Sequence, residues 1–284
     1  MILVTGATGH VGRHAVGLLL DNGSEVAAVT RNPPTANLPA EAHLVVADPS
    51  NPQTLATALN GVDAILLSPR AVGNAGTELL SLAAEHGVRR VVVLSATTVE
   101  RPAGHERFAA HFKAVEDAAK ASGLQWTFLR CADFAANALG WAPQIRSTGI
   151  VRGAYGDAAT SPIHERDIAA VAVKALTDDD HAGRSYLLTG PQPLTQRDKV
   201  RLIGQAIGRE LSFQELSPEQ VRQGMLAQGM PEDVPERLLG SLADYAKQAG
   251  PSTDTVERLL SRPALTFAEW ASEHADAFRP STQS

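Results

Sequence analysis

Three glycines close to the N-terminus have the spacing and the context of a phosphate-binding loop. Gly6, Gly9 and Gly12 form the pattern GxxGxxG and follow directly on an apolar run, residues 2–4. Glycine allows a tight turn and a close approach of the backbone to a pyrophosphate, and the first N–H groups of a following helix attract the anion. The pattern predicts a dinucleotide site, with a strand-to-helix turn that binds no ligand as the alternative. The cofactor contacts expected from this loop are Gly6, Thr8, Gly9, His10, Val11 and Gly12.

The end of the second predicted strand indicates which dinucleotide is bound. A carboxylate there would accept hydrogen bonds from a ribose 2′-hydroxyl and would repel a 2′-phosphate, but the strand ends in Thr30-Arg31-Asn32. Arg31 can pair with a 2′-phosphate and stack on adenine, with help from Arg13, which favours NADP(H) over NAD(H). A solvated surface arginine is the alternative for Arg31.

Two further polar residues follow predicted strands and are assigned to the cofactor site. Asp48 ends the third strand, where it could meet the adenine amino group, or it simply begins a turn before Pro49. Ser68 follows the fourth strand directly.

The elements that must position these residues alternate between strand and helix in the first half of the chain. Near-continuous apolar strands separated by helices are typical of a parallel sheet that is covered on both faces. Strands are expected at 1–4, 25–30, 42–47, 62–67, 90–95 and 125–131, and helices after Gly12 and at 52–59, 77–86 and 105–122.

The second half of the chain is mainly helical. A helix is expected at 165–176, and short strands at 150–155, 185–189 and 211–216. Capping boxes that begin at Thr195, Ser217 and Thr266 mark three helix starts. The fold class is therefore α/β, a Rossmann-type doubly wound parallel sheet with a smaller, mainly helical C-terminal lobe.

The predicted domains follow from this change of character. Residues 1–155 are expected to form the NAD(P)-binding domain, to which 156–190 add a helix and a late strand. Residues 191–284 are expected to form a small lobe on the substrate side, with the ligand cleft between the two parts and 279–284 frayed.

The bulk composition narrows the function classes. The chain has 284 residues, of which 44% are hydrophobic, and a net charge of -6. Nucleic-acid binding needs clustered lysine and arginine, so this charge argues against it. A single cysteine, with no signal peptide and no membrane-spanning apolar run, is typical of a cytoplasmic protein. The expected partners are a small-molecule substrate and, at most, a second copy of the chain; no metal site is predicted.

The glycine loop and several later segments resemble the NmrA-like family of atypical short-chain dehydrogenases. This family contains NADP-binding regulators and NADPH-dependent quinone, alkene and isoflavone-type reductases. The resemblance implies a Rossmann fold and NADP(H) binding, and it leaves the reaction open. The similar segments are 4–12, 87–95, 113–116, 122–130, 161–169 and 186–191.

The resemblance also identifies a missing catalytic group. Short-chain dehydrogenases usually reduce a carbonyl with a Tyr-x-x-x-Lys pair and a serine, the tyrosine supplying the proton. Lys113 matches the lysine, but Ala109 stands where the tyrosine would be. None of the three tyrosines has the required spacing, so the usual acid is absent.

The remaining catalytic candidates are few. Lys113 and Ser95 are assigned both catalytic and cofactor-binding roles, Ser95 through a hydrogen bond to nicotinamide or substrate, and the third catalytic candidate, His105, lies close to the Lys113 face of the same predicted helix. Ser95 ends the fifth strand at the family's serine position, where a strand-end cap is the alternative. For His105 an ordinary surface histidine is the alternative.

A reductase of quinones or enones would not depend on a dedicated tyrosine, because these acceptors take hydride readily and water can supply the proton. The chain would then mainly position the nicotinamide against a planar acceptor. Such a reductase of small quinones, enones or carbonyl compounds is the leading hypothesis. The alternatives are a non-catalytic NADP(H)-binding redox sensor and, last, a nucleotide-sugar epimerase or dehydratase. The candidate substrate contacts are Phe134, Asn137, Trp141 and His164, together with Leu139 as a further apolar wall residue. For all of these except His164, the alternative is a place in the core of the lobe interface.

Overall fold

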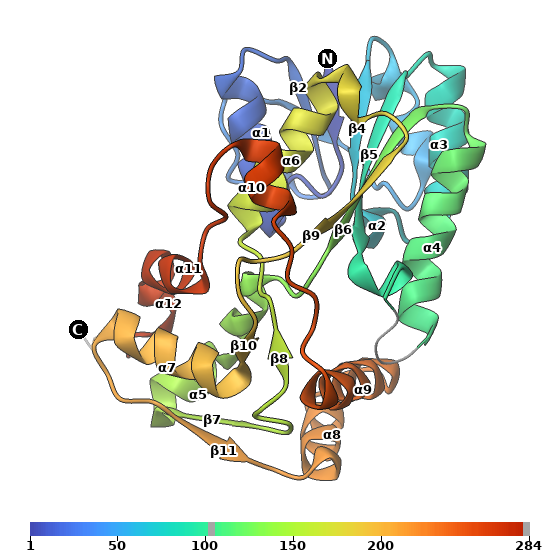
Figure 1. The fold of residues 1–284 in the computed structure, drawn as a ribbon. Helices are drawn as coiled ribbons and strands as arrows, with labels where there is room; N and C mark the ends of the chain where they lie inside the picture. The colour runs from blue at the N-terminus through green and yellow to red at the C-terminus, as the bar shows by residue number, and fades with distance from the viewer. Residues whose placement is uncertain (102–105, 281–284) are drawn as a thin grey trace. The chain divides into compact units, whose positions relative to one another are not determined.

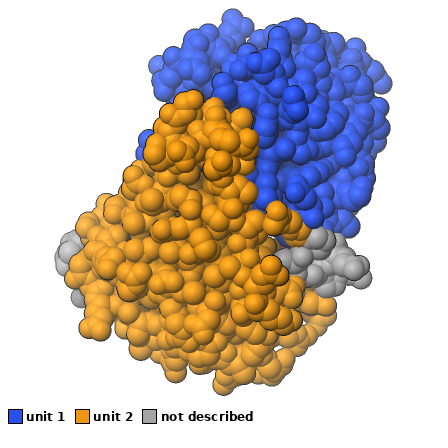
Figure 2. Space-filling model, in the orientation of Figure 1, with its two compact units in different colours: residues 1–100, 109–131, 165–188 blue, residues 101–108, 132–164, 189–284 orange. Residues whose placement is uncertain are grey.

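The computed structural model describes residues 1–101 and 106–280 and divides the chain into two compact units (Figure 2). The first unit comprises residues 1–100, 109–131 and 165–188, and the second comprises 101–108, 132–164 and 189–284. Within the described residues, no helix combines the length and the apolar character needed to cross a membrane.

The first unit is built on a seven-stranded parallel sheet in the order β3-β2-β1-β4-β5-β6-β9 (Figure 1). The chain runs outward from β1 to β3 on one side, and then returns to place β4 on the other side of β1. This reversal of strand order is the topological switch point of a doubly wound fold, which confirms the predicted fold class. The strands are β1 Ile2–Val4, β2 Val26–Thr30, β3 His43–Val46, β4 Ala64–Leu67, β5 Arg90–Ala96, β6 Gln125–Cys131 and β9 Arg184–Leu188.

Helices cover both faces of this sheet (Figure 1). On one face α1 (His10–Asp21) packs against α6 (Glu165–Thr177). On the other face lie α2 (Pro69–Val72), α3 (Gly76–Glu85) and α4 (Glu106–Ala121). Leu79 of α3 and Val115 of α4 share a buried core with Leu3, Val91 and Phe128 of the strands. Because both faces are covered, the central strands are apolar throughout rather than alternating.

One predicted helix of the first unit was wrong. Residues 52–59 form two short 3-10 turns, Pro52–Leu55 and Thr57–Leu59, instead of an α-helix. The Thr54 hydroxyl donates to the backbone carbonyls of Asn51 (2.7 Å) and Asp48 (3.1 Å). Such local side-chain bonds compete with helical hydrogen bonds, and the segment is too short to overcome them.

The second unit contains two small sheets and a set of helices. β7 (Ile150–Gly153) pairs in parallel with β11 (Ser212–Glu215), and β8 (Ala159–Thr160) pairs antiparallel with β10 (Leu194–Thr195). Its core gathers Phe267, Trp270 and Phe278 against Ile145 and Ile203. The helices are α5 Ala142–Thr148, α7 Gln196–Ile207, α8 Pro218–Ala227, α9 Asp233–Lys247, α10 Thr255–Leu260, α11 Phe267–Glu273 and α12 Ala275–Phe278.

All three predicted capping boxes are present in this unit. Thr195, Ser217 and Thr266 each accept a hydrogen bond from the backbone N–H three residues later, and the side chain at that later position accepts one from the backbone N–H of the capping residue. These reciprocal bonds satisfy donors that a helix start leaves without partners, so they fix where α7, α8 and α11 begin.

The division into units differs from the predicted domain boundaries of 1–155, 156–190 and 191–284. Residues 132–164 group with the C-terminal residues because β7 and β8 pair with β11 and β10, which come much later in the chain. Residues 165–188 supply α6 and β9 to the first unit.

Candidate functional site

The glycine loop of the first unit links β1 to α1. Gly6 has φ +65°, in the left-handed region where a side chain would be strained. The N–H of Gly9 donates to the Gly6 carbonyl over 2.9 Å, which closes the turn. Helix α1 then begins at His10, with Gly9 as its N-cap residue. Strand, glycine turn and helix therefore follow one another as the GxxGxxG pattern predicts.

The third glycine is needed for the helix to pack on this loop. A Cβ atom on Gly12 would lie 2.2 Å from the Gly6 carbonyl oxygen and 2.8 Å from the Cα of Ala7. Both are backbone atoms, which cannot move aside as a flexible side chain would. A Cβ on Gly9 would lie 3.2 Å from the same oxygen. The GxxGxxG spacing therefore places glycines where the start of α1 lies close to the backbone of residues 6–7.

The start of α1 has the form of an anion site. Gly9 has no side chain to cap the helix, so the N–H groups of the first turn are available to a ligand. Thr8, Gly9 and His10 are exposed, whereas Val11 and Gly12 are buried. Val11 and Gly12 could therefore contact a diphosphate only through their backbone. This cradle fits the pyrophosphate of a dinucleotide.

A hydrogen-bonded pair of polar residues lies where β1 and β4 end side by side. The Thr5 hydroxyl donates to the Leu66 carbonyl (3.0 Å) and accepts from the Ser68 N–H (2.8 Å). A Cβ on Gly6 would approach the Cβ of Ser68 to 3.1 Å, so Ser68 lies against the glycine loop. Thr5 was missed in the sequence; its signal is a polar residue directly after an apolar strand.

The residues that follow β2 and β3 lie at the same edge of the sheet. Asp48 accepts from the Oγ (2.8 Å) and the N–H (3.0 Å) of Ser50, and these bonds are the main reason that the pKa of Asp48 is lowered. The positive charge of Arg31 lowers the same pKa further. Asp48 therefore begins a turn, its contact with the adenine amino group stays a prediction, and Arg31 is an exposed cation beside it.

Arg13 ties the glycine loop to the segment after β2. Its Nε donates to the Thr8 carbonyl (2.9 Å), and its Nη1 donates to the Asn37 carbonyl (2.8 Å). Asn37 has φ +46°, a strained conformation for a residue with a side chain. Arg13 thus holds together the two loops that a dinucleotide would touch, and any help it gives to Arg31 remains a prediction.

Ser95, at the carboxyl end of β5, is part of a buried charged network. Its Oγ donates to Oε1 of Glu116 over 2.6 Å. Arg130 donates from Nε to the same oxygen (3.0 Å) and from Nη2 to Oε2 (2.7 Å), and its Nη1 reaches Glu100 (2.9 Å). The hydrogen bond to Glu116 is the largest cause of the raised pKa of Arg130.

Glu116 and Arg130 were not chosen as site residues from the sequence. A signal for Glu116 was available, because it shares one face of its helix with the apolar residues Phe112, Val115 and Ala119, all buried. A carboxylate in an apolar stripe requires a partner, since burying an unpaired charge is very costly. Nothing local identified Arg130 as that partner.

The other catalytic candidates are placed less favourably. Lys113 is 61% exposed on α4, and its Nζ lies 2.5 Å from Oδ2 of Asp117. Ala109 occupies the preceding turn of the same helix, so the Tyr-x-x-x-Lys pair is absent from α4. His105 lies outside the described residues. Contact of Lys113 with cofactor or substrate stays a prediction.

The substrate candidates belong to the second unit. The side-chain amide of Asn137 donates to Oδ1 of Asp133 (2.8 Å), and Leu139 and Trp141 pack against the core of the unit. His164 is 1% exposed, with Nε2 3.3 Å from Oε2 of Glu273. Phe134 is half-buried and forms an isolated bridge with Ile163. These partners are structural, and contact with a substrate stays a prediction for all of them.

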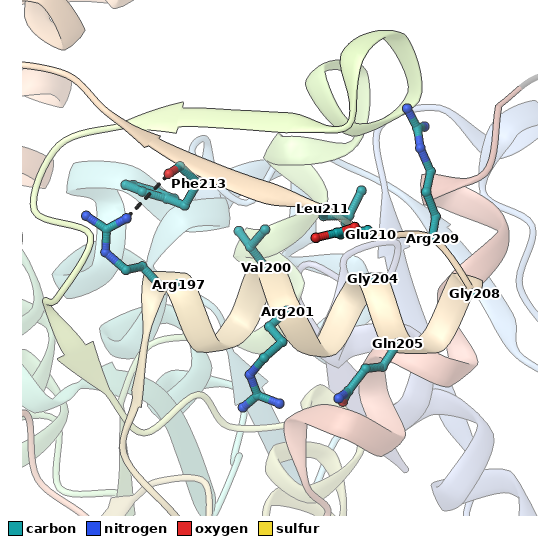
Figure 3. Close-up of a pocket in the computed structure, with 10 residues that line it drawn as sticks. All are labelled: Arg197, Val200, Arg201, Gly204, Gln205, Gly208, Arg209, Glu210, Leu211 and Phe213. Carbon is teal, nitrogen blue, oxygen red and sulfur yellow. Dashed lines mark hydrogen bonds between the residues drawn. The ribbon is translucent and has the colours of Figure 1, made fainter.

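A groove of about 610 Å³ runs along α7 and β11 of the second unit (Figure 3). Three arginines line it, but their guanidinium groups do not converge on one point (Figure 3). Arg197 is paired with Glu215 and Asp157, and Arg201 with Asp198. Arg209 donates to the Ile145 carbonyl. The guanidinium groups of these three arginines therefore do not form a joint anion-binding site in the groove.

Comparisons with known proteins agree with the glycine loop. Residues 6–179 match a family model described as NAD(P)H-binding. The chain is 40% identical to a (4-alkanoyl-5-oxo-2,5-dihydrofuran-3-yl)methyl phosphate reductase of Streptomyces griseus, over 99% of this chain and 100% of that one. It is 34% identical to an NAD(P)H azoreductase of Xenophilus azovorans, over 98% and 99% of the two chains. The crystal structure of an NADPH-dependent quinone oxidoreductase of Escherichia coli in complex with NADPH has a TM-score of 0.83. The two sequences are 25% identical, and the structural match covers 96% of this chain and 99% of the quinone oxidoreductase chain.

Proposed function

Because this chain belongs to the NmrA-like family of NAD(P)H-binding, atypical short-chain dehydrogenases, we propose that it is an NADPH-dependent reductase of conjugated carbonyl compounds. The observation that carries the proposal is full-length similarity, at 40% identity, to a protein that is itself a reductase. The glycine cradle and the exposed start of α1 supply the dinucleotide site that such a reaction needs.

The choice of NADPH rests on the residues after β2. No carboxylate stands there, and Arg31 is an exposed cation at the edge of the sheet where the adenosine end of a dinucleotide binds. A guanidinium pairs well with a 2′-phosphate. The quinone oxidoreductase with a similar fold is an NADPH complex, which supports the same assignment.

The choice of conjugated acceptors explains the absence of a tyrosine before Lys113. When bound, the reduced nicotinamide supplies a hydride. A conjugated acceptor spreads the negative charge that this creates over its carbonyl group and takes its proton from water. The chain then has only to hold the acceptor in a reactive orientation against the nicotinamide. It needs no acid at the position of Ala109.

The relatives point to the same class of acceptor. The ring named in the Streptomyces relative has one carbon–carbon double bond, which is conjugated with the ring carbonyl and with the alkanoyl group. The azo bond reduced by the second relative and the quinone of the third are also conjugated acceptors. An enone or quinone is therefore the substrate class that we assign to this chain.

The experiment is steady-state oxidation of NADPH by the full-length protein with three acceptors: an alkyl enone, a benzoquinone and a saturated ketone. We expect turnover with the enone and the quinone and none with the saturated ketone. Turnover of the saturated ketone at a similar rate would contradict the assignment, because that reaction needs an acid. Tight NADPH binding without turnover of any acceptor would favour the sensor alternative, which the missing tyrosine keeps open.

A further inference from the structure

The hydroxyl proton of Ser95 is donated to a carboxylate inside the protein. Glu116 accepts from Arg130 at both carboxylate oxygens, so it has no proton to give and acts only as an acceptor. The Ser95 hydroxyl has a single proton, and it donates this proton to Oε1 of Glu116 over 2.6 Å. What remains on the Ser95 oxygen is its lone pairs.

The hydrogen bond between Ser95 and Glu116 is strong because both residues are almost fully buried. Glu116 is 1% exposed and Ser95 is 3% exposed. Hydrogen bonds to a charged group are stronger than those between neutral groups, and burial strengthens them further. A ligand carbonyl could accept the Ser95 proton only in competition with Glu116. The buried Glu116 carboxylate would then lose a hydrogen bond that water could not replace.

The position of Ser95 makes its polarity relevant to a ligand. Ser95 lies directly opposite Arg130 in the register of β5 and β6, one residue before the end of β5. Ligands of doubly wound sheets bind beyond this carboxyl edge. The conjugated acceptors assigned above present only acceptor oxygens at their reactive end. The carboxamide of a nicotinamide, by contrast, presents two N–H donors.

We propose that Glu116 is a positioning residue that turns the Ser95 oxygen into a hydrogen-bond acceptor for the carboxamide N–H of the nicotinamide. The inference rests on the proposed function, since it requires a pyridine dinucleotide. It assigns to Ser95 a role on the cofactor rather than on the substrate carbonyl. Arg130 holds Glu116 in place through hydrogen bonds to both carboxylate oxygens.

The test compares binding of NADP⁺ with binding of its 3-acetylpyridine analogue, in which a methyl ketone replaces the carboxamide. The analogue has the same carbonyl acceptor and lacks the N–H donors. Calorimetric titration of the full-length wild-type protein is expected to favour NADP⁺ by about tenfold, the value of one typical hydrogen bond. In the Ser95→Ala variant the two ligands should bind within about twofold of each other.

Two further variants separate positioning from structural support. Glu116→Gln retains the side-chain shape, but its amide can donate to Ser95 and so free the serine proton, which should reduce the preference for NADP⁺. Ser95→Thr keeps the hydroxyl and should restore the preference. Thr127→Val removes a buried hydroxyl bond on β6, from Thr127 to the His181 carbonyl, and should leave the ratio unchanged.

The outcomes are distinct. An equal ratio of affinities in wild type and Ser95→Ala would overturn the inference, even if Ser95→Ala lowers the melting temperature. The comparison of wild type with Ser95→Ala also decides the matter if Glu116→Gln does not fold. If the wild-type protein binds neither dinucleotide, the proposed function fails and not merely this role of Ser95.

Discussion

A Cβ atom on Gly12 would lie 2.2 Å from the carbonyl oxygen of Gly6, so α1 can pack on its own loop only because position 12 has no side chain. The added Cβ would meet backbone atoms of the loop, so removing the overlap would require the helix to move away from the loop. The same loop offers its N–H groups to a diphosphate. Packing of the helix therefore depends on this glycine, and we expect binding of the cofactor to depend on it as well.

We predict that Gly12→Ala destabilises the protein by about 1–3 kcal/mol, the usual effect of forcing an added methyl into a packed region. We also expect it to weaken NADPH binding by about tenfold or more. Denaturant unfolding and fluorescence titration measure the two effects. Gly17→Ala is the matched control, because Gly17 lies in the same helix and a Cβ there meets nothing within 4 Å. That change should stabilise the protein by about 0.5–1 kcal/mol; similar losses in both variants would contradict the argument.

The second prediction concerns Arg31 and the choice of cofactor. Arg31→Ala should weaken NADPH binding by about 10- to 100-fold, as expected for the loss of a charge-assisted bond, and should leave NADH binding nearly unchanged. The two dissociation constants are measured side by side. Arg89→Ala is a suitable control, since Arg89 is 75% exposed and paired with Asp63 near the amino ends of the strands. Equal losses for both dinucleotides would remove Arg31 from the 2′-phosphate site.

The sequence predicted what depends on local patterns. The glycine turn after β1, the capping boxes at Thr195 and Thr266, and the apolar run of β5 each involve residues close together in the chain. Glycine conformation, helix capping and strand burial act over a few residues, so their signals are readable without a structure.

What the sequence could not supply is the pairing of distant polar groups. Glu116 and Arg130 are 14 residues apart, and Lys199 and Asp133 are 66 apart. No local preference couples such residues; only the packed fold brings them together. The same limit applies to the candidate Ser95, whose hydrogen-bond partner Glu116 is 21 residues away.

The third prediction concerns the buried ion pair of the second unit. Lys199 is 7% exposed and donates to Asp133 (2.8 Å) and to the Thr160 hydroxyl (2.6 Å). Burial alone would raise the pKa of Asp133, but the charge of Lys199 and the hydrogen bonds around the carboxylate outweigh it and lower the pKa.

Asp133→Asn leaves the nearly buried Lys199 without its ion pair, whereas Lys199→Met leaves Asp133, which is 26% exposed, with the hydrogen bonds of Thr160 and Asn137. We expect Asp133→Asn to cost about 3 kcal/mol or more in the free energy of unfolding, and Lys199→Met to cost less. The double variant should cost clearly less than the sum of the two, because no uncompensated charge then remains. A double-mutant cycle by urea unfolding measures this coupling, and additive effects would show that the pair does not act as a unit.

The fourth prediction is a pH dependence of stability from His181. Burial lowers its pKa below the ordinary value of 6.5, although the nearby Asp178 works in the opposite direction. The His181 side chain is 7% exposed, and its Nδ1 lies 2.8 Å from the Tyr186 hydroxyl. The folded protein thus binds a proton here less readily than the unfolded chain.

For a group of this kind, stability is fully present above the unfolded pKa and is lost as the pH falls from 6.5 toward the lower folded value. We therefore expect the free energy of unfolding to rise as the pH is raised from below 6.5 to above it, and His181→Asn to reduce that rise. Asn keeps an oxygen near the position of Nδ1 and cannot titrate. His43→Gln, on the exposed strand β3, is the control and should retain the full rise. Stability that falls over this interval in the wild-type protein, or an undiminished rise in His181→Asn, would show that the proton is taken up elsewhere.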